Sequence, residues 1–287
     1  MTIFDGPMMA VVDGSTSSLT TLPHAALSAA TLNLPLRIIH LFDEEKNPAF
    51  RGTATAVRRL EEAVAGLTSH EAVEVETVHP KRLLTYLLQR VSTETGIVAL
   101  PHERRSWLST LRFSNRHEQI LQRTPLAVLL LGPDQAVRRL AHLLFPVDLS
   151  TRSNALFAET VALCAAHQAT LHLLHLFGPD RPIRNAEEAA RRAAASSPRE
   201  MVAMDEQRLT AMAEQAEASG VVVARYTAEG RAHNGILQYA ASQPIDLIVM
   251  ASHGARNRED VLRGSTTIRV MQRSPVPVLA LRSRPAE

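Results

Sequence analysis

Two kinds of hydrophobic pattern alternate along residues 141–287, and together they predict alternating strands and helices. Short, continuous apolar runs are typical of strands buried on both faces of a sheet, whereas apolar residues three and four positions apart are typical of helices. The predicted strands are 143–147, 170–177, 221–226, 246–251 and 276–281, and the predicted helices are 153–168, 201–219, 234–242 and 264–273. This alternation predicts a doubly wound α/β fold, a parallel sheet with helices on both faces.

The pattern occurs twice. Three segments of the first half recur in the second. At an offset of 135 residues, the run ending at Asp13 matches the run ending at Asp148, and 36–42 matches 171–177. At an offset of 150 residues, 122–129 matches 272–279. We therefore predict two tandem domains, each with a five-stranded parallel sheet, over residues 1–132 and 141–287, joined by a linker at 132–140. The larger second offset predicts extra residues in the Ala/Arg/Ser-rich stretch 181–200.

Composition narrows the class of protein. A chain of 287 residues with 45% hydrophobic and 21% charged residues can bury two cores. Only 4% of the residues are aromatic and the cations form no long stripe, which argues against a nucleic-acid partner. Neither a signal peptide nor an apolar run of about 18 residues is present, so we expect a soluble, cytoplasmic protein that does not enter a membrane.

The single cysteine, Cys164, excludes an intrachain disulfide and a CxxC metal site. It lies within an apolar helical run. We therefore expect a buried structural thiol rather than a reactive one.

The C-terminal part of the second half carries a candidate anion site. In doubly wound sheets, ligands lie beyond the carboxyl ends of the strands, where the strand order reverses. There Gly254 allows close approach of the backbone, and a helix opening at Gly264 offers free N–H groups to an anion, with Ser265 and Thr266 adding hydroxyl donors. The alternative is that Gly254 only forms a turn and Ser265 only caps the helix.

These residues resemble the universal stress proteins. The ATP-binding members of that family carry G-x2-G-x9-G-[ST] between the fourth strand and the fourth helix, and the segment from Ala251 to Ser265 reproduces this motif except for alanine in the first glycine place. The resemblance extends over both halves, including the Pro146-Val147-Asp148 opening and the P-V-P-V-L ending. It implies the adenine-nucleotide alpha-hydrolase-like fold.

The resemblance also implies a ligand, which is ATP, with ADP or AMP as alternatives and Mg as an optional companion ion. The residues it assigns to this ligand fall into three groups: Val147 and Asp148, with Pro146 before them, lie beside the adenine, with Leu176 on the apolar wall; Met250, Ala251, His253 and Gly254 line the ribose and phosphates; Gly264, Ser265, Thr266 and Thr267 hold the phosphates. The methyl group of Ala251 is expected to weaken binding without blocking it.

Each assignment has a plainer alternative. Asp148 is equally explained as a strand-end carboxylate that caps the next helix, and His253 as an exposed loop histidine. Three arginines near the motif are expected to lie in a solvated loop rather than to balance phosphate charge: Arg256, Arg258 and Arg263.

The first half departs from the motif. Where the second half has Ala251, Gly254, Gly264 and Ser265, the first has Pro101, Arg104, Ser114 and Asn115. Arg104 would place a long side chain where the site needs bare backbone. Asp13 is retained, so the first half could still keep part of the adenine-binding side of the site. We interpret this half as a structural or partner-binding copy.

Three functions follow from these patterns. The first is a nucleotide-binding protein of stress response or regulation with slow ATP hydrolysis at most, since no GxxxxGK[ST] occurs. The second is an interaction scaffold that binds no nucleotide, and the third is an enzyme that uses His253 or Asp148 as an acid or base. The resemblance implies that the last strand joins the two copies as an intrachain pseudo-dimer; a homodimer and an unidentified protein partner stay open.

Overall fold

The computed structural model describes residues 4, 6–13, 15–42, 58, 62–64, 73–91, 96–101, 120–121, 123–124, 126–132, 134–177, 190, 197–251 and 266–282. Its first half contains β1 (Met8–Val12), α1 (Thr16–Thr31), β2 (Leu36–Leu41), β3 (Glu74–Val78), α3 (Leu83–Val91), β4 (Ile97–Pro101) and β5 (Ala127–Leu131). Its second half contains β6 (His142–Val147), α5 (Thr151–His167), β7 (Thr170–Phe177), α7 (Pro198–Glu217), β8 (Val223–Glu229), α8 (Ala232–Ser242), β9 (Leu247–Ala251), α10 (Thr266–Arg273) and β10 (Val278–Leu281).

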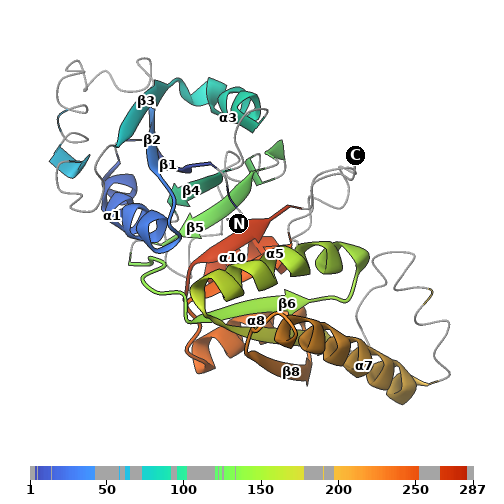
Figure 1. Cartoon of the computed structure of the whole chain (residues 1–287). Coiled ribbons are helices and arrows are strands. Elements are labelled where there is room, and N and C mark those ends of the chain that lie inside the picture. The colour runs from blue at the N-terminus through green and yellow to red at the C-terminus, as the bar shows by residue number, and fades with distance from the viewer. Residues whose placement is uncertain are drawn as a thin grey trace.

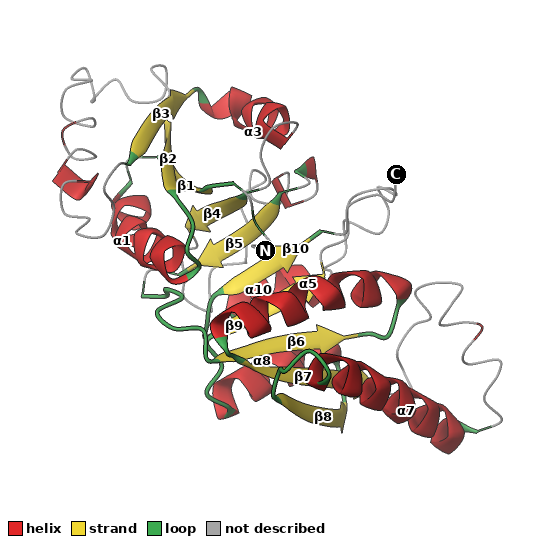
Figure 2. Cartoon of the chain, in the orientation of Figure 1, coloured by secondary structure: helices red, strands yellow, loops and turns green. Residues whose placement is uncertain are grey.

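The strands form a single ten-stranded sheet (Figure 2). Its order is β3-β2-β1-β4-β5-β10-β9-β6-β7-β8, so each half repeats one arrangement outward from the middle. Pairing within each half is parallel, whereas β5 and β10 pair antiparallel, with Leu129 opposite Leu279. The predicted α/β class is confirmed. The last strand, β10, which the resemblance expects to join the two copies, pairs with β5 of the first half and therefore lies inside the sheet.

Helices cover both faces of the sheet (Figure 1). Apolar residues of α1, α5 and α7 pack in one buried cluster, and those of α3, α8 and α10 pack in another. Neighbouring residues of one strand point to opposite faces, so Phe145 of β6 belongs to the first cluster and Leu144 to the second. This burial on both faces explains why the strand sequences are continuously apolar.

The beginning of α7 differs from the prediction. The sequence pattern starts this helix at residue 201 and treats 181–200 as inserted chain, but the helix begins at Pro198. The Ser197 side chain accepts a hydrogen bond from the Glu200 N–H at 3.2 Å, and proline at the first helical position already has the required φ. A local cap, rather than apolar periodicity, therefore sets this boundary.

Two expectations from composition can be compared with the structure. Cys164 is fully buried in α5, and burial raises the pKa of its thiol to about 12, as expected for a structural cysteine. Among the described residues, no helix is both long and apolar enough to cross a membrane.

Candidate functional site

The strand order of the second half reverses between β6 and β9. From β6 the chain continues to β7 on one side, while β9 pairs with β6 on the other. Asp148 directly follows β6, and Ala251 is the last residue of β9. Because these strands are parallel, both residues lie at the carboxyl edge of the sheet, where ligands of doubly wound folds bind.

One hydrogen bond joins the end of β9 to the beginning of α10. The Thr267 hydroxyl donates to the Ala251 carbonyl oxygen at 3.2 Å, and α10 itself begins at Thr266. The described start of the helix is therefore held against the strand end. Four residues that the motif places between them lie outside the described residues: His253, Gly254, Gly264 and Ser265.

The Asp148 carboxylate organises the first turn of α5. Its Oδ1 accepts hydrogen bonds from the Ser150 N–H at 3.1 Å, the Ser150 hydroxyl at 2.6 Å and the Ser153 hydroxyl at 2.5 Å. Ser150 is the N-cap of α5 and accepts from the Ser153 N–H. The structure therefore shows the alternative role of Asp148: its carboxylate holds the serine that caps the next helix.

The remaining predicted site residues are largely inside the core. Val147 and Met250 are each 5% exposed and Leu176 is 6% exposed. Leu176 packs against α8, where a Cβ added to Gly235 would lie 2.6 Å from its Cδ2 atom. These side chains are therefore shared between the core and the carboxyl edge of the sheet.

A buried histidine behind this edge was missed by the sequence analysis. His175 of β7 is 2% exposed, with its Nδ1 3.0 Å from the Val147 carbonyl oxygen. Since a carbonyl only accepts, Nδ1 carries a proton. Nε2 lies 3.4 Å from Asp205 Oδ2 on α7, an ion pair when His175 is protonated. The sequence repeat could have pointed to His175, because His40 occupies the equivalent place in the first half.

Arg282 is a second residue that the sequence analysis missed. It directly follows β10, whose Leu281 pairs with Ala251, so it lies at the same carboxyl edge. Its guanidinium donates to the Leu121 carbonyl oxygen at 3.0 Å, and burial lowers its pKa below the ordinary value of 12.5. This cation lies among the described residues, whereas Arg256, Arg258 and Arg263 do not.

The comparisons with known proteins decide the family. Residues 140–282 match the model of the Universal stress protein family. The chain therefore belongs to the universal stress protein family through its second half. The resemblance inferred from the motif is confirmed.

Individual universal stress proteins match to different extents. Universal stress protein MJ0577 of Methanocaldococcus jannaschii is 36% identical over 55 residues, which cover 19% of this chain and only 34% of that relative. The crystal structure of a universal stress protein from Archaeoglobus fulgidus has 17% identity and a TM-score of 0.69 and covers 99% of both chains, which shows the fold along the whole chain. A universal stress protein in complex with cAMP covers 51% of this chain and 99% of its own, with 19% identity and a TM-score of 0.38.

The first half of this universal stress protein repeats the strand-end turn of the second. Asp13 Oδ1 accepts from the Ser15 N–H at 3.1 Å and the Ser15 hydroxyl at 2.6 Å, and Ser15 caps α1. Pro101 ends β4 as Ala251 ends β9. The turn is thus common to both halves, while Arg104, Ser114 and Asn115 lie outside the described residues.

We expect Asp13 to contribute stability that depends on acidic pH. Burial raises its pKa, but hydrogen bonds from Ser15 and Ser18 outweigh this effect and hold the pKa below its ordinary value of 3.8. The contribution is therefore complete above pH 3.8 and is lost as the pH falls through the lowered pKa. Thermal unfolding of the wild type and Asp13→Asn should differ above this window and converge below it; a constant difference would contradict the prediction.

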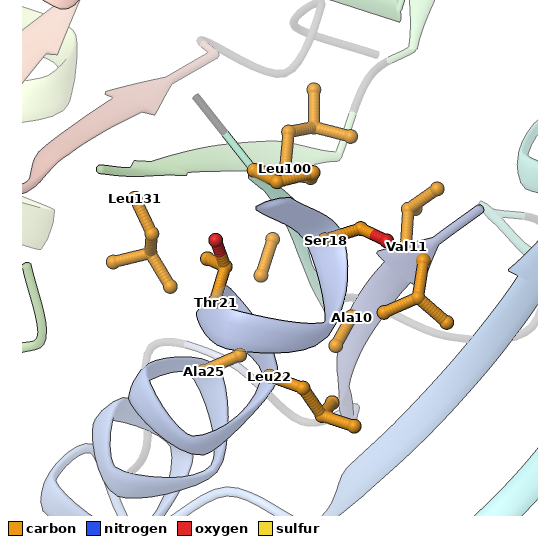
Figure 3. A pocket seen from close by; sticks show the side chains of 11 residues that line it. Ala10, Val11, Ser18, Thr21, Leu22, Ala25, Leu100 and Leu131 are labelled. Atoms are coloured by element: carbon orange, nitrogen blue, oxygen red, sulfur yellow. The ribbon is translucent and has the colours of Figure 1, made fainter. Parts of the chain in front are cut away.

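The halves differ in packing beneath the first helix. A small hollow in the first half lies between α1 and the carboxyl ends of β1, β4 and β5 (Figure 3). Ala10, Thr21 and Leu22 line it. At the offset of 135 the second half carries three larger residues, all buried: Phe145, Leu156 and Phe157. The second half therefore fills with aromatic rings a space that stays partly open in the first.

Metal binding has no support in the described part of the chain. These residues contain no group of three or more His, Cys, Asp or Glu side chains able to hold a metal ion.

Proposed function

We propose that the second half of this universal stress protein binds an adenine nucleotide, most simply ATP, with ADP or AMP as alternatives and Mg as an optional companion. The protein then acts in cytoplasmic stress response or regulation and hydrolyses ATP slowly at most. The observation that carries this proposal is the hydrogen bond from Thr267 to Ala251, because it holds a helix start against a strand end at the point where the strand order reverses.

The chemistry of this edge suits a nucleotide. The positive dipole end of α10 favours phosphate oxygens, and the Thr267 hydroxyl, which donates to the Ala251 carbonyl oxygen, holds this helix end against β9. Arg282 directly follows β10 at the same edge, and its guanidinium donates to the Leu121 carbonyl oxygen of the first half. Asp148 lies on the other side of the strand-order reversal, where the family resemblance places the adenine.

The first test is to denature the purified protein and identify any released nucleotide by chromatography, followed by equilibrium binding of ATP, ADP and AMP. Gly264→Asp should lower affinity at least about tenfold, because it adds a carboxylate where the phosphates would bind. The matched control is Ser114→Asp, which introduces the same aspartate at the equivalent place of the first half and should leave affinity unchanged. If Gly264→Asp and the wild type bind equally, the site does not exist.

The alternative function is an interaction scaffold without nucleotide. The role of Asp148 in holding the α5 cap favours this alternative, because it explains that residue without a ligand. A wild-type protein that releases no nucleotide and binds none would establish the scaffold. ATP turnover well above background that disappears in His253→Ala would instead establish an enzyme.

A further inference from the structure

β8 is the outermost strand of the second half and lies at one end of the sheet (Figure 2). The Leu171 N–H donates to the Val222 carbonyl and the Gly230 N–H donates to the Phe177 carbonyl. Even-numbered residues of β8 therefore direct their backbone groups toward β7. The odd-numbered residues direct theirs outward, as a row able to pair with another strand.

Two large side chains at this edge are exposed to solvent. Val222 is 67% exposed and Tyr226 is 49% exposed. On the opposite face of the strand lie two exposed side chains of opposite charge, Arg225 and Glu229. Arg225 donates to the Thr210 hydroxyl of α7, which fixes it on that face, while Glu229 has no ion-pair partner among the described residues.

We propose that β8 pairs antiparallel with β8 of a second copy of this chain, about a two-fold axis at Thr227. This register places Arg225 opposite Glu229 of the second copy, twice in the dimer, on the same face of the extended sheet. It uses only outward-directed backbone groups. Opposite charges directly across an antiparallel pair stabilise it.

Neighbouring registers lack this match. An axis at residue 225 places Arg225 opposite Arg225 of the second copy. An axis at residue 228 places Arg225 opposite Arg231 of the second copy. Moving it to residue 226 sets each charge against an uncharged residue. An axis halfway between two residues would pair outward-directed with inward-directed backbone groups. Only the axis at Thr227 satisfies both the backbone and the charges.

The other end of the sheet is a poorer candidate. At β3 the charged side chains are already paired within the chain, with Arg37 2.7 Å from Glu74 and Arg90 2.7 Å from Glu76. Pairing of β8 with β3 of another copy would also be head-to-tail and open-ended, giving masses above two chains. The charge pattern favours a closed pair of β8 strands.

The experiment is a solution mass over a range of protein concentrations, by sedimentation equilibrium. The wild type should approach twice the chain mass of 31.4 kDa. Arg225→Glu and Glu229→Arg should each weaken dimerisation about tenfold or more, because each sets like charges opposite one another. The double variant, Arg225→Glu with Glu229→Arg, should restore the dimer.

Two further variants control for folding. Arg138→Glu reverses an exposed charge between β5 and β6 and should leave the dimer intact. Thr227→Pro removes an outward N–H that only the partner strand uses, so the chain should fold and stay at the mass of one chain. The proposal is overturned if the wild type has the mass of one chain, if masses exceed two chains, if single reversals still dimerise, or if the double variant fails to restore pairing.

Discussion

Replacing Phe145 with alanine is expected to lower the free energy of unfolding by about 3–5 kcal/mol. The Phe145 side chain is completely buried between the sheet and α5, and its ring centroid lies 6.2 Å from that of Phe157. Removing it takes away buried apolar area and leaves a cavity that the parallel strands on both sides of β6 cannot close. Denaturant unfolding followed by circular dichroism measures the loss.

The control for this variant is Leu88→Ala on α3. Leu88 is 43% exposed, so its truncation should cost only a few tenths of a kcal/mol. Phe145→Leu should fall between the two, because it keeps most of the buried volume. A Phe145→Ala protein as stable as Leu88→Ala would show that the second half is not packed around this ring.

The second large effect is expected at Asp148. Asp148→Ala should lower the free energy of unfolding by about 2–3 kcal/mol, because it removes the acceptor of three hydrogen bonds at the start of α5. Asp148→Asn should cost less than about 1 kcal/mol, since an amide oxygen can accept the same bonds. Equal losses in the two variants would show that the negative charge, rather than the acceptor geometry, stabilises the turn.

The same pair of variants separates the structural role of Asp148 from its proposed ligand role. If Asp148 contacts the adenine, Asp148→Asn should lose nucleotide affinity while it keeps most of its stability. If the carboxylate only holds the capping serine, Asp148→Asn should bind as the wild type does. Isothermal titration of both variants at a temperature where each is folded distinguishes these outcomes.

The strands of the second half could be predicted closely because their apolar runs have sharp ends. The predicted strand 170–177 agrees with β7 at both ends. β8 was predicted less accurately: the pattern gives 221–226, but the strand spans Val223–Glu229 and is half exposed, with polar residues that interrupt the apolar run. An edge strand buries too little of itself to leave a strong hydrophobic signal.

The position of the candidate site could be predicted from topology, whereas the side-chain contacts around it could not. Strand-end location and the reversal of strand order suffice to bring Asp148 and Ala251 to one edge. The contact between His175 and Asp205 joins residues of β7 and α7 that are separated by a long connection. No spacing rule links such a pair, so only the packing of α7 on the sheet reveals it.

The antiparallel pairing of β5 with β10 has a consequence for how the chain can be divided. A cut in the segment between Gly132 and Leu140 would not release two self-sufficient proteins, because each fragment would expose a fully apolar strand, with its backbone groups unmatched, along one side. Each fragment would then have to pair its exposed strand with a strand of another molecule. Covalent linkage of the two halves supplies that partner strand within the same chain and fixes a one-to-one ratio of unlike halves.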